Sequence, residues 1–381
     1  MDREQLTAIG LNHLAGMGAI PVTSYYEQPV ADYILAQCTD IGVETRVDRY
    51  GNILATRKGE DVAADGIAFV AHMDHPGYEA LSAEDDGVHG RGLGGLPPQA
   101  YESGVAVTFV GSDGRRVPGL IMGRAGARSG DNLIFEVAQD RLGPLPCAVV
   151  LDLPDFDYDE QTKLIRMRAA DDLAGCASVL AVMRSSMESP TPGPVYGLFT
   201  RAEEVGLVGA RLAAADGLLP AGTNVVSVET SSILPGAEIG RGPVVRTGDR
   251  MTTFGFEAEE YLAAAVSGVG DFPIQRQLMQ AGTCEGTAFA RNGYPTTGLA
   301  YPLGARHNNG PDSTIRPEFI HHDDFATGIA LLAGAAALSP LAFPAVGQMR
   351  PVRVGAALPF SGGLELFGDQ ARIGLDLAAQ E

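Results

Sequence analysis

Cysteine is scarce in this sequence, and its placement excludes two kinds of site. The 381 residues include only four cysteines, Cys38, Cys147, Cys176 and Cys284. They are dispersed and form no Cys-x-x-Cys pair, so we expect neither a disulfide framework nor a thiolate metal site. We predict four buried free thiols instead.

Basic residues and long hydrophobic runs are also in short supply. The chain has 27 Lys and Arg against 47 Asp and Glu, a formal net charge of −20, which argues against nucleic acid as a partner. No apolar stretch is long enough to cross a bilayer, and Met1–Gln5 lacks the basic and apolar regions of a signal peptide. We therefore predict a cytoplasmic protein with no membrane partner.

The spacing of apolar residues changes twice along the chain. Residues 1–79 and 167–340 alternate strand and helix patterns, as an α/β domain does, whereas residues 80–166 show short β-like runs separated by turn pairs such as Asp86-Gly87. An all-β module inserted between two segments of one α/β domain explains this pattern. Residues 341–381 are a Pro- and Gly-rich extension of unknown role with short β-like pieces.

Two adjacent carboxylates stand out in the second α/β segment. The apolar run Pro194–Thr200 predicts a strand, and Glu203 and Glu204 follow it just before Gly206 and a new helical pattern. Ligands of open α/β sheets bind beyond the carboxyl ends of the strands. Because adjacent carboxylates repel each other, a cation or a shared proton is needed to hold them together.

Other strand ends offer ligands for such a cation. They are His72 and Asp74 after the run from Ile67, Asp171 at the start of a helix, Glu229 at the end of a strand, and His307 after Leu299–Leu303. Imidazole and carboxylate groups together suit zinc, cobalt or manganese. The ordered set therefore predicts a metal centre at one edge of the sheet.

The same motifs resemble a known family. The chain is similar to the glutamyl/tetrahedral aminopeptidase family of dinuclear metallopeptidases in order and spacing from about Gly18 to Leu338. The motifs that carry this resemblance are Ala71-His72-Met73-Asp74, Ala170–Cys176, Glu203–Ala210, Gly282-Thr283 and the late His307. The resemblance implies a three-layer α/β/α catalytic domain with an inserted, barrel-like β domain through which relatives assemble into homo-oligomers.

The resemblance also implies roles for single residues. His72 and Glu229 would bind one divalent metal, Glu204 and His307 the other, and Asp171 would bridge the two. The metals would be zinc, with cobalt or manganese as alternatives. Glu203 would be the general base and Asp74 would orient the imidazole of His72, so that the enzyme removes N-terminal residues from short peptides.

Several positions depart from the family pattern. His75 follows the first histidine motif where an acid is usual, and we predict a surface histidine near the mouth of the site. Glu229 stands where an Asp is usual, which lengthens that ligand by one methylene. Cys284 stands where an Asp often follows Gly-Thr, and Glu285 is a candidate to compensate.

Two other motifs resemble ligand sites but have simpler structural interpretations. His321-His322-Asp323-Asp324 precedes a helical pattern, and we predict that it caps this helix rather than binding a metal. Gly90–Gly95 resembles a phosphate loop superficially but lacks the following Lys-Ser/Thr and helix, so we predict a loop without a ligand.

The sequence leaves rival functions open. A dipeptidase, a carboxypeptidase or an N-acyl amino-acid deacylase would use the same ligands, and an arginine such as Arg306 or Arg241 near the metals would favour a substrate carboxylate over a free amine. A binding or scaffold protein that kept the fold is a further alternative, but such a protein has no need for a general base and a full ligand set.

Overall fold

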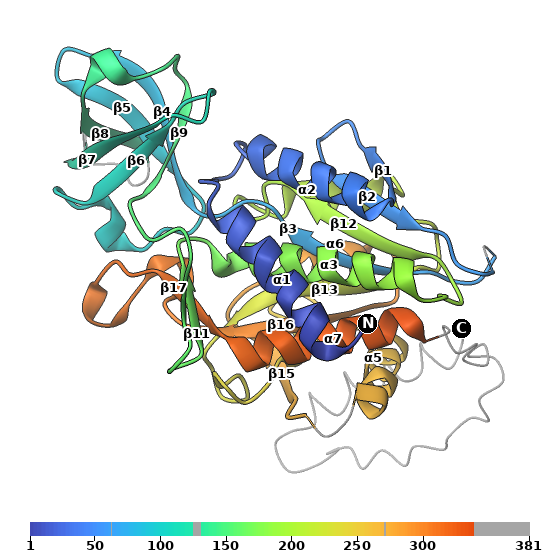
Figure 1. Cartoon of the computed structure of the whole chain (residues 1–381). Helices are drawn as coiled ribbons and strands as arrows, with labels where there is room; N and C mark the ends of the chain where they lie inside the picture. The colour runs from blue at the N-terminus through green and yellow to red at the C-terminus, as the bar shows by residue number, and fades with distance from the viewer. Residues whose placement is uncertain (62, 125–130, 270–271, 339–381) are drawn as a thin grey trace, which may run out of the picture. The chain divides into compact units, whose positions relative to one another are not determined.

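The computed structural model describes residues 1–61, 63–124, 131–269 and 272–338 (Figure 1). The predicted C-terminal extension, residues 341–381, lies outside the described residues together with its β-like pieces. No helix of the described part is long and apolar enough to span a membrane.

A mixed sheet of eight strands forms the centre of the α/β part. The strand order is β1-β2-β12-β3-β13-β16-β14-β15, and β12, β3, β13 and β16 run parallel to one another. The bounds are β1 Glu44–Val47, β2 Ile53–Arg57, β3 Ile67–His72, β12 Val195–Thr200, β13 Asn224–Ser232, β14 Val244–Asp249, β15 Gln275–Met279 and β16 Thr296–Leu303. Strands β3, β12 and β16 are buried along their whole length, as apolar runs in a covered parallel sheet should be.

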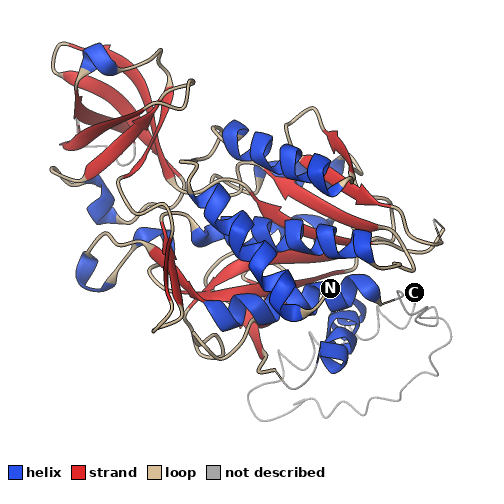
Figure 2. Cartoon of the chain, viewed as in Figure 1, coloured by secondary structure: helices blue, strands red, loops and turns tan. Residues whose placement is uncertain are grey.

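Helices cover both faces of this sheet (Figures 1 and 2). One face packs against α2 Gln28–Ile41, α3 Ala170–Glu188, α5 Phe256–Val269 and α7 His322–Ala337, with α1 Arg3–Gly18 packed on α3 and α7, and the other face packs against α4 Val208–Ala215 and α6 Glu285–Arg291. Successive residues of β3 point to opposite faces, so Phe69 joins the first core and Val70 the second. The predicted three-layer α/β/α domain is confirmed.

The insertion forms a closed six-stranded barrel with the order β4-β5-β8-β7-β6-β9. Its strands are β4 Gly77–Glu84, β5 Gly87–Leu93, β6 Ala106–Val110, β7 Arg116–Arg124, β8 Asp131–Val137 and β9 Cys147–Leu151, with 3₁₀ turns η1 Pro98–Tyr101 and η2 Gln139–Arg141. Tyr78, Phe109 and Phe135 fill the interior, where Phe135 meets both other rings edge to face. The predicted all-β, barrel-like insertion is confirmed.

The prediction of a loop at Gly90–Gly95 is wrong for its first four residues. Gly90 to Leu93 belong to β5, which pairs with β4 and β8. Glycine is needed here for close packing rather than for a ligand, because a Cβ on Gly90 would lie 2.2 Å from the carbonyl oxygen of Glu79.

A small antiparallel sheet follows the barrel. It consists of β10 Asp157–Asp159, β11 Leu164–Met167 and β17 Glu318–His321, in the order β10-β11-β17. His321 is the last residue of β17. Its side chain accepts a hydrogen bond from the backbone N–H of Asp323 and so caps α7. The predicted capping role of His321–Asp324 is confirmed.

Candidate metal centre

The candidate site lies where neighbouring strands of the large sheet end. Residue His72 ends β3 beside Thr200, the last residue of β12, and Glu229 lies on the adjacent β13. The turn after β12 is held by Arg201, whose guanidinium pairs with the buried carboxylate of Glu27 at 2.7 Å. This framework brings the loop that carries Glu203 and Glu204 to the end of β3.

His72 is buried, and its two ring nitrogens face different partners. Nδ1 lies 3.1 Å from the backbone carbonyl oxygen of Asp74 and 3.5 Å from Oδ1 of the same residue, so this nitrogen carries the proton. Nε2 lies 3.4 Å from Oδ1 of Asp171, so a metal ion bound between them would take the place of a proton on Nε2. An imidazole held in this way presents Nε2 as a metal ligand.

Asp171 enters the site from the first turn of α3, where the backbone is not yet helical (φ −82°, ψ 103°). Its Oδ2 lies 3.6 Å from Nε2 of His307, and Nε2 of His307 lies 3.2 Å from Oε1 of Glu204. His307 itself has a positive φ of 54° within the short 3₁₀ turn η3 Arg306–Asn308, which aims its ring at the two carboxylates.

The site has the properties of a cation site. Ligand atoms of His72, Asp171 and Glu204 all lie within 4.8 Å of one another. Among the described residues, Oδ1 of Asp171 is buried with no hydrogen-bond partner, and Nε2 of His307 is buried with no contact of hydrogen-bond geometry, although Oε1 of Glu204 lies 3.2 Å away. Buried polar atoms normally have partners, and lone pairs that converge without donors fit a divalent cation.

The electrostatics agree with this interpretation. Burial opposes a charge on His72, yet the carboxylates of Asp171 and Asp74 raise its pKa well above the usual value. Burial likewise opposes a charge on His307, and Glu204 nevertheless raises its pKa to about 9. Without a cation, the excess of carboxylates at this edge thus favours protonated imidazoles, and a divalent metal would replace those protons.

Glu203 and Glu229 line the same narrow cavity as His72, Asp171 and Glu204. Burial, reinforced by Glu204 and Glu229, raises the pKa of Glu203 well above its usual value. Burial and the neighbouring Glu285 do the same to the pKa of Glu229. Both carboxyl groups therefore lie where a proton or a cation is favoured.

Asp74 connects the two halves of the site. Its Oδ1 accepts the backbone N–H of Glu203 at 2.9 Å, and its Oδ2 accepts that of Glu204 at 3.3 Å and the hydroxyl of Ser24 at 2.5 Å. One carboxylate thus lies against the His72 imidazole and also fixes the turn that carries the two glutamates.

The prediction that His75 lies on the surface is wrong. Its ring is buried, with Nδ1 2.7 Å from the backbone carbonyl of Asp171 and Nε2 3.1 Å from Oδ1 of Asn308. The chain turns inward directly after β3, so this histidine lies between the loops that carry Asp171 and His307.

Two charged residues at the site were not identified from the sequence alone. Glu318, on β17, accepts the backbone N–H of Asp171 at 2.9 Å and that of His307 at 2.6 Å. Arg246, on β14, is fully buried and donates to the carbonyl oxygen of Thr230. Arg246 follows the apolar pair Val244-Val245, which is its only signal in the sequence, whereas Glu318 has no such signal.

Of the two arginines considered for substrate carboxylates, only Arg306 lies at the site. Its Nε is 3.7 Å from Oδ2 of Asp171, and it lines the cavity. Arg241 has a largely exposed side chain that faces Glu238 at 3.9 Å and does not line this cavity.

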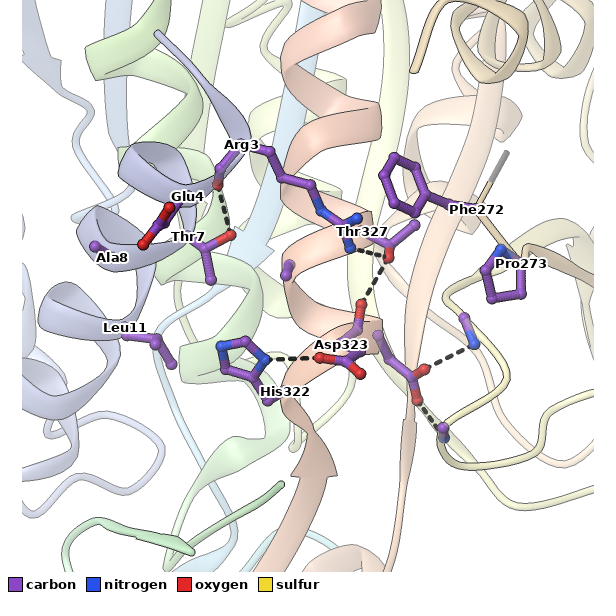
Figure 3. Close-up of a pocket in the computed structure, with 14 residues that line it drawn as sticks. Arg3, Glu4, Thr7, Ala8, Leu11, Phe272, Pro273, His322, Asp323 and Thr327 are labelled. Carbon is purple, nitrogen blue, oxygen red and sulfur yellow. Dashed lines mark hydrogen bonds and ion pairs between the residues drawn. The ribbon is translucent and has the colours of Figure 1, made fainter. Parts of the chain in front are cut away.

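A separate cavity of about 740 Å³ lies between α1, α7 and Phe272–Pro273 (Figure 3). Two of the three acids that line it already have partners, because Asp323 pairs with Lys163 at 2.7 Å and Asp324 accepts the backbone N–H groups of Gly240 and Gly242, and the third, Glu4, is exposed. This cavity therefore does not offer a second metal centre.

Comparisons with known proteins agree with the geometry. Residues 149–328 match the family model of M42 glutamyl aminopeptidases. A provisionally named aminopeptidase of Acetivibrio thermocellus is 24% identical over 302 residues, which cover 74% of this chain and 87% of the relative. The glutamyl aminopeptidase of Lactococcus lactis is 25% identical over 218 residues, which cover 51% of this chain and 59% of the relative.

Among solved structures, the TET1 peptidase of Pyrococcus horikoshii shares the fold with a TM-score of 0.71 and 21% identity, over 86% of this chain and 99% of that one. That peptidase can assemble into a tetrahedron or a large octahedral shell. The family match, the two aminopeptidase relatives and the converging imidazole and carboxylate groups identify the chain as a metallo-aminopeptidase that is similar to the M42 glutamyl aminopeptidases over residues 149–328.

Proposed function

We propose that the chain removes N-terminal residues from short peptides with two divalent metal ions held at the end of β3, β12 and β13. The observation that carries this proposal is the convergence of His72, Asp171 and Glu204 within 4.8 Å of one another, with Nε2 of His307 3.2 Å from Glu204. Zinc is the expected metal, and cobalt and manganese are alternatives with the same ligand chemistry.

Within this proposal the ligands divide into two sets that share Asp171. His72 and Glu229 would hold one ion, and Glu204 and His307 would hold the other. The proximity of Asp171 to both histidines, 3.4 Å to His72 and 3.6 Å to His307, supports the bridging role. When bound, the ions supply Lewis-acid activation of water and of the scissile carbonyl group.

Glu203 is the general base in this proposal. A carboxylate whose pKa is raised by burial and by Glu204 can take a proton from the attacking water and return it to the leaving amine. Asp74 acts at a distance by fixing the His72 imidazole and the backbone of Glu203. Asp74 and His72 are both buried, and this burial keeps bulk water away from the proton transfer.

Recognition of the substrate terminus decides between an aminopeptidase and its rivals. Carboxylates that are not consumed by metal binding favour a free N-terminal amine, whereas Arg306 at the cavity favours a free carboxylate, as in a dipeptidase, carboxypeptidase or N-acyl amino-acid deacylase. The four acids that line the cavity all have proposed roles at the metals, so the preference for a free amine rests on the two aminopeptidase relatives.

The test is a panel of chromogenic aminoacyl anilides beside N-blocked peptides, with protein reconstituted with zinc, cobalt or manganese and a chelated control. We expect hydrolysis of free-amine substrates only, and loss of that hydrolysis with chelator. Cleavage of blocked substrates alone would move the assignment to a deacylase or carboxypeptidase, and silence with every metal would contradict the proposal.

We also propose that the chain forms a homo-oligomer, as the TET1 peptidase of Pyrococcus horikoshii does when it assembles into its tetrahedron or octahedral shell. The sequence-based expectation of a cytoplasmic location is part of the same proposal. Cell fractionation with an antibody against the chain tests it.

A further inference from the structure

The inserted barrel reaches the candidate metal centre through one short turn. Strand β5 ends at Leu93, and the next two residues, Gly94 and Gly95, lie against the loop that carries His307. Nδ1 of His307 lies 2.8 Å from the backbone carbonyl oxygen of Gly95. Because a carbonyl oxygen only accepts hydrogen bonds, Nδ1 donates its proton here, which leaves Nε2 as the nitrogen that can bind a metal ion.

The same turn leaves no room for a side chain. A Cβ on Gly95 would lie 2.8 Å from Nδ1 of His307, so the ring would have to shift. A Cβ on Gly94, whose φ is +79°, would lie 3.1 Å from Cβ of Glu204. The two glycines thus touch two of the proposed ligands of one metal ion.

A second contact ties the barrel to the same loop. Nε2 of Gln99, from the 3₁₀ turn η1 of the insertion, donates to Oδ1 of Asn309 at 2.6 Å. On its other side the backbone N–H of His307 is held by Glu318 at 2.6 Å. The backbone of His307 is therefore fixed by the α/β part, whereas the orientation of its ring depends on the barrel.

We propose that Gly95 is a positioning residue of the metal centre, whose carbonyl, supplied by the inserted barrel, fixes the tautomer and orientation of the His307 imidazole. Gly94 and Gly95 act here by close approach, which explains the glycine-rich sequence at the end of β5 without any phosphate ligand. The inference rests on the metal centre proposed above. Groups that orient a metal-binding histidine typically contribute about 10- to 100-fold to metal affinity.

The test compares Gly95→Ala with Gly143→Ala. Gly143 also lies in the insertion, its φ is not in the left-handed region, and a Cβ there would meet only the Cα of Gly111 at 4.0 Å. Zinc affinity and stoichiometry are measured by competition with a chromophoric chelator, and the melting temperature is measured for the metal-free proteins. We expect Gly95→Ala to bind one of the two zinc equivalents about 10- to 100-fold more weakly, and Gly143→Ala to bind as the wild type does.

The double variant separates positioning from general destabilisation. If Gly95 acts through His307, Gly95→Ala should cost no further zinc affinity in a His307→Ala background. An equal loss in both backgrounds, or unchanged affinity in the single variant, would overturn the inference. If the wild type binds no zinc, or His307→Ala binds it normally, the proposed metal centre itself fails instead.

A second variant keeps the inference testable if Gly95→Ala does not fold, because it removes atoms and adds none. Gln99→Ala removes the neighbouring contact between the barrel and the His307 loop. Here zinc affinity should fall severalfold with the metal-free melting temperature close to that of the wild type. Unchanged affinity would again overturn the inference.

Discussion

Glu203 and Glu204 are neighbours in the chain, yet their carboxyl groups have different surroundings. Both line the cavity, but Glu204 faces Nε2 of His307 at 3.2 Å, whereas burial and the neighbouring Glu204 and Glu229 raise the pKa of Glu203. Adjacent residues in an extended turn point in different directions, so one can bind a cation while the other stays available for a proton. This difference separates the two roles in a way that mutation can test.

We expect Glu203→Gln to lower kcat about 10²- to 10⁴-fold, the usual contribution of a general base, with both metal equivalents retained. The amide keeps the size of the side chain but cannot take a proton. Glu204→Ala should instead weaken metal binding. Activity assays and metal analysis of the purified variants measure both effects, with Glu257→Gln, an exposed glutamate on α5, as the control. Substantial activity in Glu203→Gln would refute its role as general base.

At the scale of single residues, the sequence predicted site residues where charged side chains directly followed an apolar strand. Glu203 and Glu204 were recognisable because two repelling charges followed an apolar strand. Glu318 was not, because its function depends on accepting N–H groups from Asp171 and His307, which lie 147 and 11 residues away in the chain. His75 was misplaced for the same reason, since its burial is created by the loops that close over it.

At the scale of elements, the strands that carry the site were predictable and some others were not. The continuous apolar runs that begin at Ile67 and Pro194 predicted two strands, and the structure has them as β3 Ile67–His72 and β12 Val195–Thr200. Strand β14 escaped detection because Arg246 interrupts its apolar pattern, and the partners that allow this arginine to be buried, the carbonyl of Thr230 and the hydroxyl of Ser231, lie on another strand. The three short strands β10, β11 and β17 stabilise one another only after the chain has folded.

Packing between α1 and α2 makes stability depend on pH. His13 of α1 lies 3.3 Å from the hydroxyl of Tyr33 on α2, and burial lowers the pKa of His13 to about 4. A folded-state pKa below the ordinary value of about 6.5 means that protonation favours the unfolded chain. The stability from the neutral imidazole is present above pH 6.5 and is lost as the pH falls toward 4.

We therefore expect His13→Gln to flatten the pH dependence of unfolding. Between pH 7 and pH 4.5 the wild type should lose up to roughly 3 kcal/mol more stability than this variant, reduced by partial solvation of the ring. Denaturant unfolding at a series of pH values measures the difference. His89→Gln is the control, because His89 lies on the barrel and pairs with the exposed Asp86. Parallel pH curves for wild type and His13→Gln would exclude His13 as the titrating group.

At the scale of the whole molecule, the barrel exposes apolar side chains that are left uncovered in a single chain. Strand β7 alternates buried residues such as Val117 and Ile121 with outward ones, and Leu120 and Met122 are 41% and 49% exposed on its outer face. Apolar side chains gathered on one strand are typical of a contact surface. The proposed homo-oligomer would bury such residues, consistent with the role that the sequence suggested for the insertion.

Replacing both residues with glutamate should therefore reduce the size of the assembly. In solution the wild type is expected to have a mass several times the 39.8 kDa of one chain, and Leu120→Glu/Met122→Glu a lower mass, because two buried charges without partners oppose association. Light scattering coupled to size-exclusion chromatography measures both. Met187→Glu, at a residue 42% exposed on α3, controls for added charge outside the barrel. A wild type of 39.8 kDa would refute the oligomer, and an unchanged assembly in the double variant would place the contact surface elsewhere.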